Sequence, residues 1–174
     1  INNPPRYAKT ELAVINFIAK GFAINPLSRF IHVSYSGDLA WDNSSHIRSF
    51  INLPEFQQMW PMQMSQSDHA KKKWELITGG GLLAAPSGGA ITGFGAGTIN
   101  QGIFGGAVVV DDPLKPKDAH SDALRKKVND QFAETLYSRL ATEKTPMAII
   151  MQRLHEDDAT AHLLKGGMNG EKWH

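Results

Sequence analysis

The chain opens with a dense helical pattern of hydrophobic residues, followed by a strand pattern and a second helical pattern. Residues 10–21 predict a mostly buried helix with Gly21 as its C-terminal stop. Its apolar positions are Leu12, Ala13, Ile15, Phe17 and Ile18. Residues 30–35 are a short β-rich run that predicts a strand, and residues 38–50 predict a helix. The first fifty residues should therefore fold as helix, strand and helix.

The middle of the chain carries weaker periodic signals. Residues 51–75 contain Pro54, Pro61 and a Gln/Met-rich stretch, and are expected to form mainly loop with short helical pieces. Eleven of residues 79–106 are glycine. This composition predicts twisted strands joined by tight turns, a glycine-rich hairpin, because glycine permits close backbone approach and positive φ.

Regular hydrophobic patterns return after residue 106. Residues 107–110 form an apolar strand pattern that runs into two carboxylates, and residues 147–151 form another. Between them, Ser121 can cap a helix whose apolar residues recur every four positions, with Arg125 on another face. The recurring residues are Leu124, Val128, Phe132, Leu136 and Leu140. Alternating helices and strands indicate an α/β fold with a largely parallel sheet and right-handed crossovers.

Length and composition narrow the class of protein. A chain of 174 residues with 41% hydrophobic content is expected to form one domain over residues 1–174. The 18 Lys and Arg against 17 Asp and Glu create no global basic field, so a nucleic-acid contact would need a local patch. The absence of Cys excludes disulfides and thiolate metal sites. No apolar run approaches the roughly 20 residues of a membrane span, and a soluble, cytoplasmic protein is expected.

The first candidate for chemistry is the loop that precedes the first helix. Lys9 and Thr10 stand where the phosphate-binding pattern G-x-x-x-x-G-K-[ST] has its Lys and Ser/Thr. Asn3 and Ala8 replace the two glycines of that pattern. A lysine and backbone N–H groups can hold the β- and γ-phosphates of a nucleotide, while the hydroxyl binds Mg²⁺.

A second candidate lies about a hundred residues later. Asp111 and Asp112 end the apolar strand pattern of residues 107–110, and Gln152 and Arg153 end that of residues 147–151. In a parallel α/β sheet, ligands bind at the carboxyl ends of the strands. We therefore expect the loop, the two carboxylates and Gln152 to converge on one edge, with Gln152 close to Asp111 across one strand spacing.

With these motifs in order, the chain resembles the large terminase subunit of tailed phages, the ATP-driven motor that packages DNA. The matching segments are residues 4–12, Ser34-Tyr35-Ser36-Gly37-Asp38-Leu39-Ala40, Gly89-Ala90-Ile91-Thr92-Gly93, Val110-Asp111-Asp112-Pro113-Leu114-Lys115, and Gln152-Arg153-Leu154-His155-Glu156-Asp157-Asp158. The resemblance covers the ATPase portion and implies a P-loop NTPase fold of the additional-strand type, with helices flanking the sheet. It also implies ATP and Mg²⁺ as cofactors.

The resemblance assigns roles to individual residues. Lys9 resembles the lysine on the β/γ-phosphates, Thr10 the hydroxyl on Mg²⁺, and Asp111 the carboxylate that holds the metal. Asp112 takes the place of a catalytic Glu that orients the attacking water, although its side chain is one methylene shorter. The resemblance also places Arg6, Tyr7 and Ala8 in the nucleotide-binding loop, and Arg6 resembles a phosphate-sensing, catalytic arginine. Gln152 resembles a segment that couples γ-phosphate status to DNA movement.

The resemblance also implies partners and a larger assembly. The expected partners are double-stranded DNA, a portal protein and a small terminase subunit, with a homo-pentameric ring for the full-length protein. The position of the loop near residue 1 suggests that the chain is a fragment, lacking an upstream strand and a downstream nuclease domain. The segment Gly93-Phe94-Gly95 offers no arginine where relatives have one, so an arginine finger has no obvious carrier. A helicase-like P-loop motor and an inactive truncated fragment remain as alternatives.

Two further motifs have simpler explanations. The run Lys71-Lys72-Lys73-Trp74 has the composition of a DNA contact, but such a run is more often a solvated face. His155 and His162 would share a helix face with Asp158, yet their spacing lacks the His-Glu-x-x-His pattern of a zinc site. Residues 156–158 are instead expected to cap the following helix.

Overall fold

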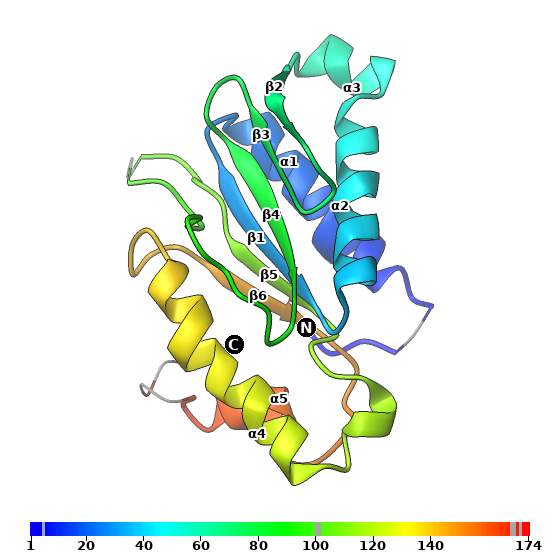
Figure 1. The fold of residues 1–174 in the computed structure, drawn as a ribbon, viewed down its shortest axis with the longest axis vertical. Coiled ribbons are helices and arrows are strands. Elements are labelled where there is room, and N and C mark those ends of the chain that lie inside the picture. Colours follow the sequence, from blue (N-terminus) through cyan, green and yellow to red (C-terminus); the bar gives the residue numbers. More distant parts are fainter. Residues whose placement is uncertain (5, 100–101, 168–169, 171) are drawn as a thin grey trace.

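A computed structural model describes residues 1–4, 6–99, 102–167, 170 and 172–174. Its centre is a six-stranded sheet of order β2-β3-β4-β1-β5-β6 (Figure 1). The four strands β4, β1, β5 and β6 run parallel, whereas β2 and β3 add an antiparallel edge. The expected mixed α/β fold with a largely parallel sheet is confirmed.

The element bounds follow the chain order. The strands are β1 (Arg29–Ser34), β2 (Met64–His69), β3 (Lys73–Leu76), β4 (Gly81–Pro86), β5 (Val108–Asp111) and β6 (Met147–Ile150). The longer helices are α1 (Phe17–Ile24), which continues the π-helical η1 (Glu11–Asn16), α2 (Gly37–Ile51), α3 (Pro54–Met59), α4 (Asp122–Gln131) and α5 (Ala159–Leu164). Short turns of helix are η2 (Pro116–Asp118), η3 (Phe132–Leu136) and η4 (Tyr137–Arg139).

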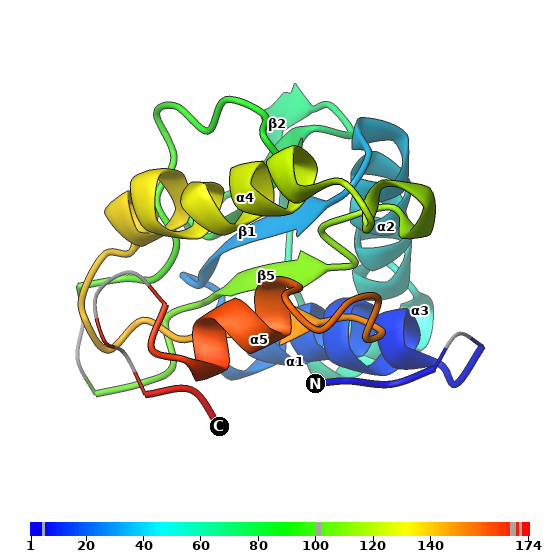
Figure 2. The ribbon, with the colours of Figure 1, turned by 90° about the horizontal axis from the view of Figure 1, so that it is seen from below.

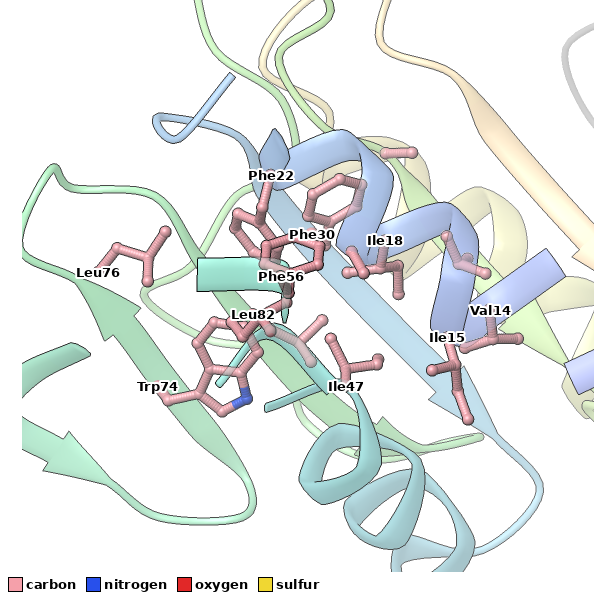
Figure 3. Close-up of a cluster of buried hydrophobic side chains, with 14 of the residues drawn as sticks. Val14, Ile15, Ile18, Phe22, Phe30, Ile47, Phe56, Trp74, Leu76 and Leu82 are labelled. Atoms are coloured by element: carbon pink, nitrogen blue, oxygen red, sulfur yellow. The ribbon is translucent and has the colours of Figure 1, made fainter. Parts of the chain in front are cut away.

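One face of the sheet is covered by η1, α1 and α2. The helices bring Ile18, Phe22 and Ile47 onto side chains of the sheet such as Phe30 and Trp74 (Figure 3). The ring of Phe22 lies with its centroid 5.0 Å from that of Phe30 and 5.3 Å from that of Trp74. Burial of so much aromatic and aliphatic surface fixes the helix that follows the Lys9 loop against the sheet.

The opposite face is covered by α4, η3 and α5 (Figure 2). Val108 and Val110 of β5 point to this face, whereas Val109 between them points to the other, as the alternation of a strand requires. The predicted stripe is buried at Val128, Phe132 and Leu136, while its first residue Leu124 is exposed. Ser121 caps α4, accepting a hydrogen bond from the Leu124 N–H at 3.4 Å. The result is a three-layer α/β/α arrangement.

Gly21 does not end the first helix, contrary to expectation. The helix continues to Ile24, and Gly21 is buried against Phe30 and Phe104. A Cβ atom at position 21 would lie 2.4 Å from the Phe30 Cζ atom. Glycine is needed here for close helix–sheet packing, and its helix-ending tendency is overridden by that packing.

Residues 51–75 contain more regular structure than expected. The short helix α3 agrees with the expectation, but β2 and β3 form the antiparallel edge of the sheet. In β3 the apolar residues Trp74 and Leu76 are buried and alternate with Lys73 and Glu75. Four residues are too few for this alternation to stand out beside the lysine run.

The glycine-rich segment forms a hairpin only at its start. Strands β3 and β4 pair antiparallel across a turn that contains Gly79 and Gly80, and β4 then pairs parallel with β1. After β4, the described part of residues 87–107 is largely irregular, with a single bridge between Ala96 and Leu140. The expectation of further strands there was wrong. Gly106, at φ +114°, shows why glycine is required, because a Cβ atom would meet the Arg29 carbonyl oxygen at 2.0 Å.

Arg125, which the sequence places on another face than the apolar stripe of α4, is nevertheless buried. Its guanidinium donates to the Ala119 carbonyl at 2.6 Å and pairs with Asp122, and the residue is buried. The aliphatic part of an arginine can pack on apolar surface while its head is paired, so polarity alone does not show that a helical residue is exposed.

No helix within the described part of the chain is long and apolar enough to cross a membrane.

Candidate functional site

The site lies at the end of the sheet where the parallel strands β1, β5 and β6 finish, and this end is called the edge of the site below. Asp111 is the last residue of β5, in register with Ser34 on one side and Ile150 on the other. Residues 1–3 continue the sheet beyond β6 at this end, because Asn2 forms a parallel bridge with Met151 just after β6. β6 therefore lies between β5 and the segment that leads into the Lys9 loop. In Figure 1 this dark blue loop passes the lower end of the sheet before the helix begins.

Thr10 links this loop to β5. Its Oγ1 donates a hydrogen bond to Asp111 Oδ2 at 2.6 Å. Thr10 precedes η1, whose buried Val14 and Ile15 hold the helix on the sheet, so the hydroxyl is placed by packing rather than by the loop alone. A hydroxyl and a carboxylate in contact are the donor set that Mg²⁺ accepts from proteins.

Lys9 makes the second link, to the residue after β5. Its Nζ lies 2.6 Å from Asp112 Oδ1 and 2.5 Å from Oδ2, so the ammonium contacts both carboxylate oxygens. The Lys9 side chain is only 9% exposed and that of Asp112 24%. Partial burial of this ion pair reduces its screening by water and makes it more than a surface contact.

The backbone around these residues adopts left-handed conformations at non-glycine positions. Arg6 has φ 68° and Ala8 φ 54°, on either side of Tyr7, and Asp112 has φ 44°. Such values cost an alanine on the order of 1 kcal/mol, and they cluster at functional sites. Ala8 stands where the phosphate-loop pattern has its second glycine, and it takes the backbone region that glycine favours.

Burial dominates the electrostatic environment of Asp111. It is 1% exposed, and this desolvation raises its pKa above the ordinary value, with the nearby charge of Asp112 adding to the rise. The Thr10 hydrogen bond and the charge of Lys9 act in the opposite direction. Its Oδ1 has no hydrogen-bond partner within the described structure. A bound cation would offset the cost of burying this carboxylate.

The remaining predicted site residues fall at the same edge with less definite contacts. Gln152 follows Met151 directly after β6 and is half-buried, one strand over from Asp111, as expected from the sequence. Arg153 instead pairs with Asp158 at 2.9 Å, and Asp158 caps α5, so the expected cap of that helix is confirmed. Arg6 and Tyr7 are exposed on the loop, and their predicted contacts with a nucleotide stay predictions.

The lysine run of residues 71–73 lies before and at the start of β3, which is two strands away from β1 in the sheet. Lys71 lies 3.6 Å from Asp42, and Lys72 lies over the ring of Trp41. These contacts fit the simpler interpretation of a solvated face. Among the described residues, no group of three His, Cys, Asp or Glu side chains gathers into a metal-binding cluster.

The donor set therefore fits a Mg²⁺–nucleotide complex and not an all-protein metal cage. Thr10 Oγ1 and Asp111 would supply the protein oxygens, and Mg²⁺ ordinarily takes its other ligands from water and phosphate. Lys9 would be the cation that faces the phosphates, and the unpartnered Asp111 Oδ1 is the buried oxygen that such a complex would satisfy. When bound, Mg²⁺ neutralises the charge that develops on the phosphates.

Two polar residues of β1 were missed by the sequence reasoning. Ser34 and His32 are fully buried and lie on the same strand face, two positions apart. Ser34 ends an apolar strand pattern, which is the signal that selected Gln152, so it could have been found. His32 sits within the run, and nothing in the sequence sets it apart from a core residue.

Comparison with known proteins establishes the class of fold. No family model matches the chain, and no curated protein matches it. Among solved structures, the crystal structure of the HK97 bacteriophage large terminase is similar, with a TM-score of 0.57 over 95% of this chain and 16% sequence identity. The chain spans 31% of that protein's length. The fold is thus terminase-like, in agreement with the family to which the sequence motifs pointed.

Proposed function

We propose that this chain is the ATP-hydrolysing motor portion of a phage terminase large subunit, which drives packaging of viral double-stranded DNA. The observation that carries the proposal is the pair of contacts Thr10–Asp111 and Lys9–Asp112. They join a loop at one end of the chain to the end of a strand a hundred residues away. Lys9, Thr10 and Asp111 are of the residue types that hold phosphates and metal in P-loop enzymes, and Asp112 stands in the place of the Glu that orients the attacking water.

The sheet order supports the same assignment. In this chain β6 lies between β5 and residues 1–3, so one strand separates the carboxylate strand from the phosphate-loop segment. That is the arrangement expected of the additional-strand type of P-loop fold. The left-handed backbone at Ala8 adds support, because it gives the loop the curvature that the usual glycine provides.

On this proposal each residue of the site has its own role. Lys9 binds the β- and γ-phosphates, and Thr10 and Asp111 orient Mg²⁺. Asp112 accepts a hydrogen bond from the attacking water and orients it toward the γ-phosphate, after Lys9 has moved to the phosphates. Arg6 contacts phosphate from the exposed loop, and Gln152, beside Asp111 at the same edge, transmits the state of the γ-phosphate. The proposed partners are DNA, a portal protein, a small terminase subunit and further copies in a pentameric ring.

The two carboxylates should separate in a mutational test. Asp111→Asn is expected to weaken Mg²⁺-dependent ATP binding by about tenfold, because a neutral amide is a poorer ligand for a hard cation. Asp112→Asn is expected to leave binding at least as tight as in the wild type while turnover falls by about a hundredfold or more. Binding is measured by titration of a fluorescent ATP analogue, and turnover by phosphate release.

A matched control is Asp157→Asn, which removes an exposed carboxylate that pairs with Lys165 at 3.1 Å. It should change neither quantity. Absence of Mg²⁺-dependent ATP binding by the wild-type chain would overturn the proposed function. If Asp112→Asn turned over ATP at the wild-type rate, the catalytic carboxylate would have to lie elsewhere.

A further inference from the structure

Two buried residues that are paired at the end of the sheet each have a side-chain oxygen atom without a partner. Ser34 is 0% exposed and Asp111 1%, and the two residues are Cα partners in the parallel pair β1–β5. Ser34 Oγ and Asp111 Oδ1 each lack a hydrogen-bond partner within the described structure. An unsatisfied buried hydroxyl or carboxylate oxygen costs free energy, so two at adjacent positions require an explanation.

Both side chains point to the face that carries the Lys9 loop. Along β1, Ser34 alternates in phase with Phe30, which packs in the α1–α2 core, and along β5, Asp111 alternates in phase with Val109 of the same core. Thr10 approaches Asp111 from this face through Oδ2, which leaves Oδ1 as the oxygen without a contact. Ser34 therefore borders the same carboxylate as Thr10.

Ser28 shows that this strand does satisfy a buried serine elsewhere. It directly precedes β1, is also 0% exposed, and its hydroxyl lies 3.4 Å from the carbonyl oxygens of both Gly21 and Phe104, either of which can accept its one hydrogen. Ser34 is equally buried, yet its hydroxyl has no such acceptor. The difference between the two ends of one strand is the neighbourhood of Asp111.

We propose that Ser34 is a positioning residue of the Mg²⁺–nucleotide site, whose hydroxyl donates a hydrogen bond within the polar shell that Mg²⁺ and its waters form around Asp111. The inference rests on the proposed function. Groups around a metal site that orient its ligands typically contribute tenfold or more to metal affinity. Ser34 holds no phosphate and takes no proton; it acts through Asp111.

The test is Ser34→Ala, measured in three conditions. Without nucleotide or metal, the unfolding midpoint should be unchanged or higher, because the substitution removes an unsatisfied hydroxyl. The affinity for ATP in EDTA should also be unchanged. With Mg²⁺ present, the ATP affinity should fall by about tenfold, and the Mg²⁺ concentration that gives half-maximal binding should rise by a similar factor.

Ser28→Ala is the matched control. It removes a satisfied hydroxyl, so it should lower the unfolding midpoint and leave the Mg²⁺ dependence of ATP binding as in the wild type. A Ser34→Ala chain that binds Mg²⁺–ATP like the wild type overturns the role of Ser34 while the proposed function stands. Equal loss of ATP affinity with and without metal also overturns it, because Ser34 would then act on the loop. A wild-type chain without Mg²⁺-dependent binding overturns both.

Discussion

Replacing Lys9 by alanine is expected to reduce ATP turnover by about a thousandfold. In the structure Lys9 is a partly buried cation at the start of the helix, with its Nζ 2.5 Å from an Asp112 carboxylate oxygen. On the proposed function it supplies the main fixed positive charge against the developing charge on the γ-phosphate, and preorganised groups of this kind are worth several kcal/mol. Phosphate release under saturating Mg²⁺–ATP measures the effect.

Lys20→Ala provides the comparison, because Lys20 is an exposed lysine on α1, the continuation of the helix that follows Lys9. It should leave turnover unchanged. A chain with Lys9→Ala that still hydrolyses ATP at the wild-type rate would remove the loop from the candidate site. An unfolding midpoint measured on the same samples separates loss of chemistry from loss of structure.

The second large effect concerns the pH dependence of stability. His32 is fully buried in the central strand, where desolvation lowers its pKa from 6.5 to about 4. Its Nδ1 lies 3.1 Å from the Val109 carbonyl oxygen and its Nε2 3.1 Å from Asn43 Nδ2. The neutral ring satisfies both contacts, with Nδ1–H as donor and Nε2 as acceptor, whereas a protonated ring would face the amide with a second N–H.

Because the pKa of His32 is lower in the folded state than in the unfolded state, the contribution of its neutral ring to stability is complete above pH 6.5. It is lost as the pH falls toward about 4. Over that interval the free energy of unfolding should decrease by about 3 kcal/mol through this residue alone. Chemical denaturation at about pH 7.5 and about pH 4 measures the change.

His32→Gln, which keeps a donor and an acceptor but does not titrate, should flatten the pH profile by that amount. His46→Gln on the exposed face of α2 is the matched control and should leave the profile as it is. If His32→Gln and the wild type lost stability equally between the two pH values, His32 would not be the group responsible.

The elements that the sequence predicted correctly are those with long or regular hydrophobic patterns. β1, α2, β5 and β6 were all expected within about two residues of their bounds, because each combines a clear period with flanking breakers. The misses share a physical cause, which is that tertiary packing overrode a local signal. Gly21 fits against Phe30 inside a helix. Trp74 is buried within a strand that reads as a continuation of a lysine run.

The candidate site was likewise predicted only in part from the sequence. The convergence of the Lys9 loop, Asp111 and Gln152 on one edge follows from the rule that parallel strands end together, so the sequence was sufficient for it. The specific partners were not predictable, since Lys9–Asp112 and Thr10–Asp111 depend on side-chain reach from a loop with unusual backbone. The position of Ser34 at a strand end was visible in the sequence, whereas its burial beside Asp111 is known only from the structure.

On the proposed function, the ion pair between Lys9 and Asp112 determines the order in which the nucleotide and the attacking water bind. One ammonium cannot neutralise both Asp112 and a polyphosphate, so arrival of the nucleotide exchanges one counter-ion for another. While the lysine is engaged, Asp112 is occupied and cannot orient a water molecule. Release of the carboxylate would thus follow from correct placement of the phosphates, and water would be recruited only after the phosphates have taken the lysine.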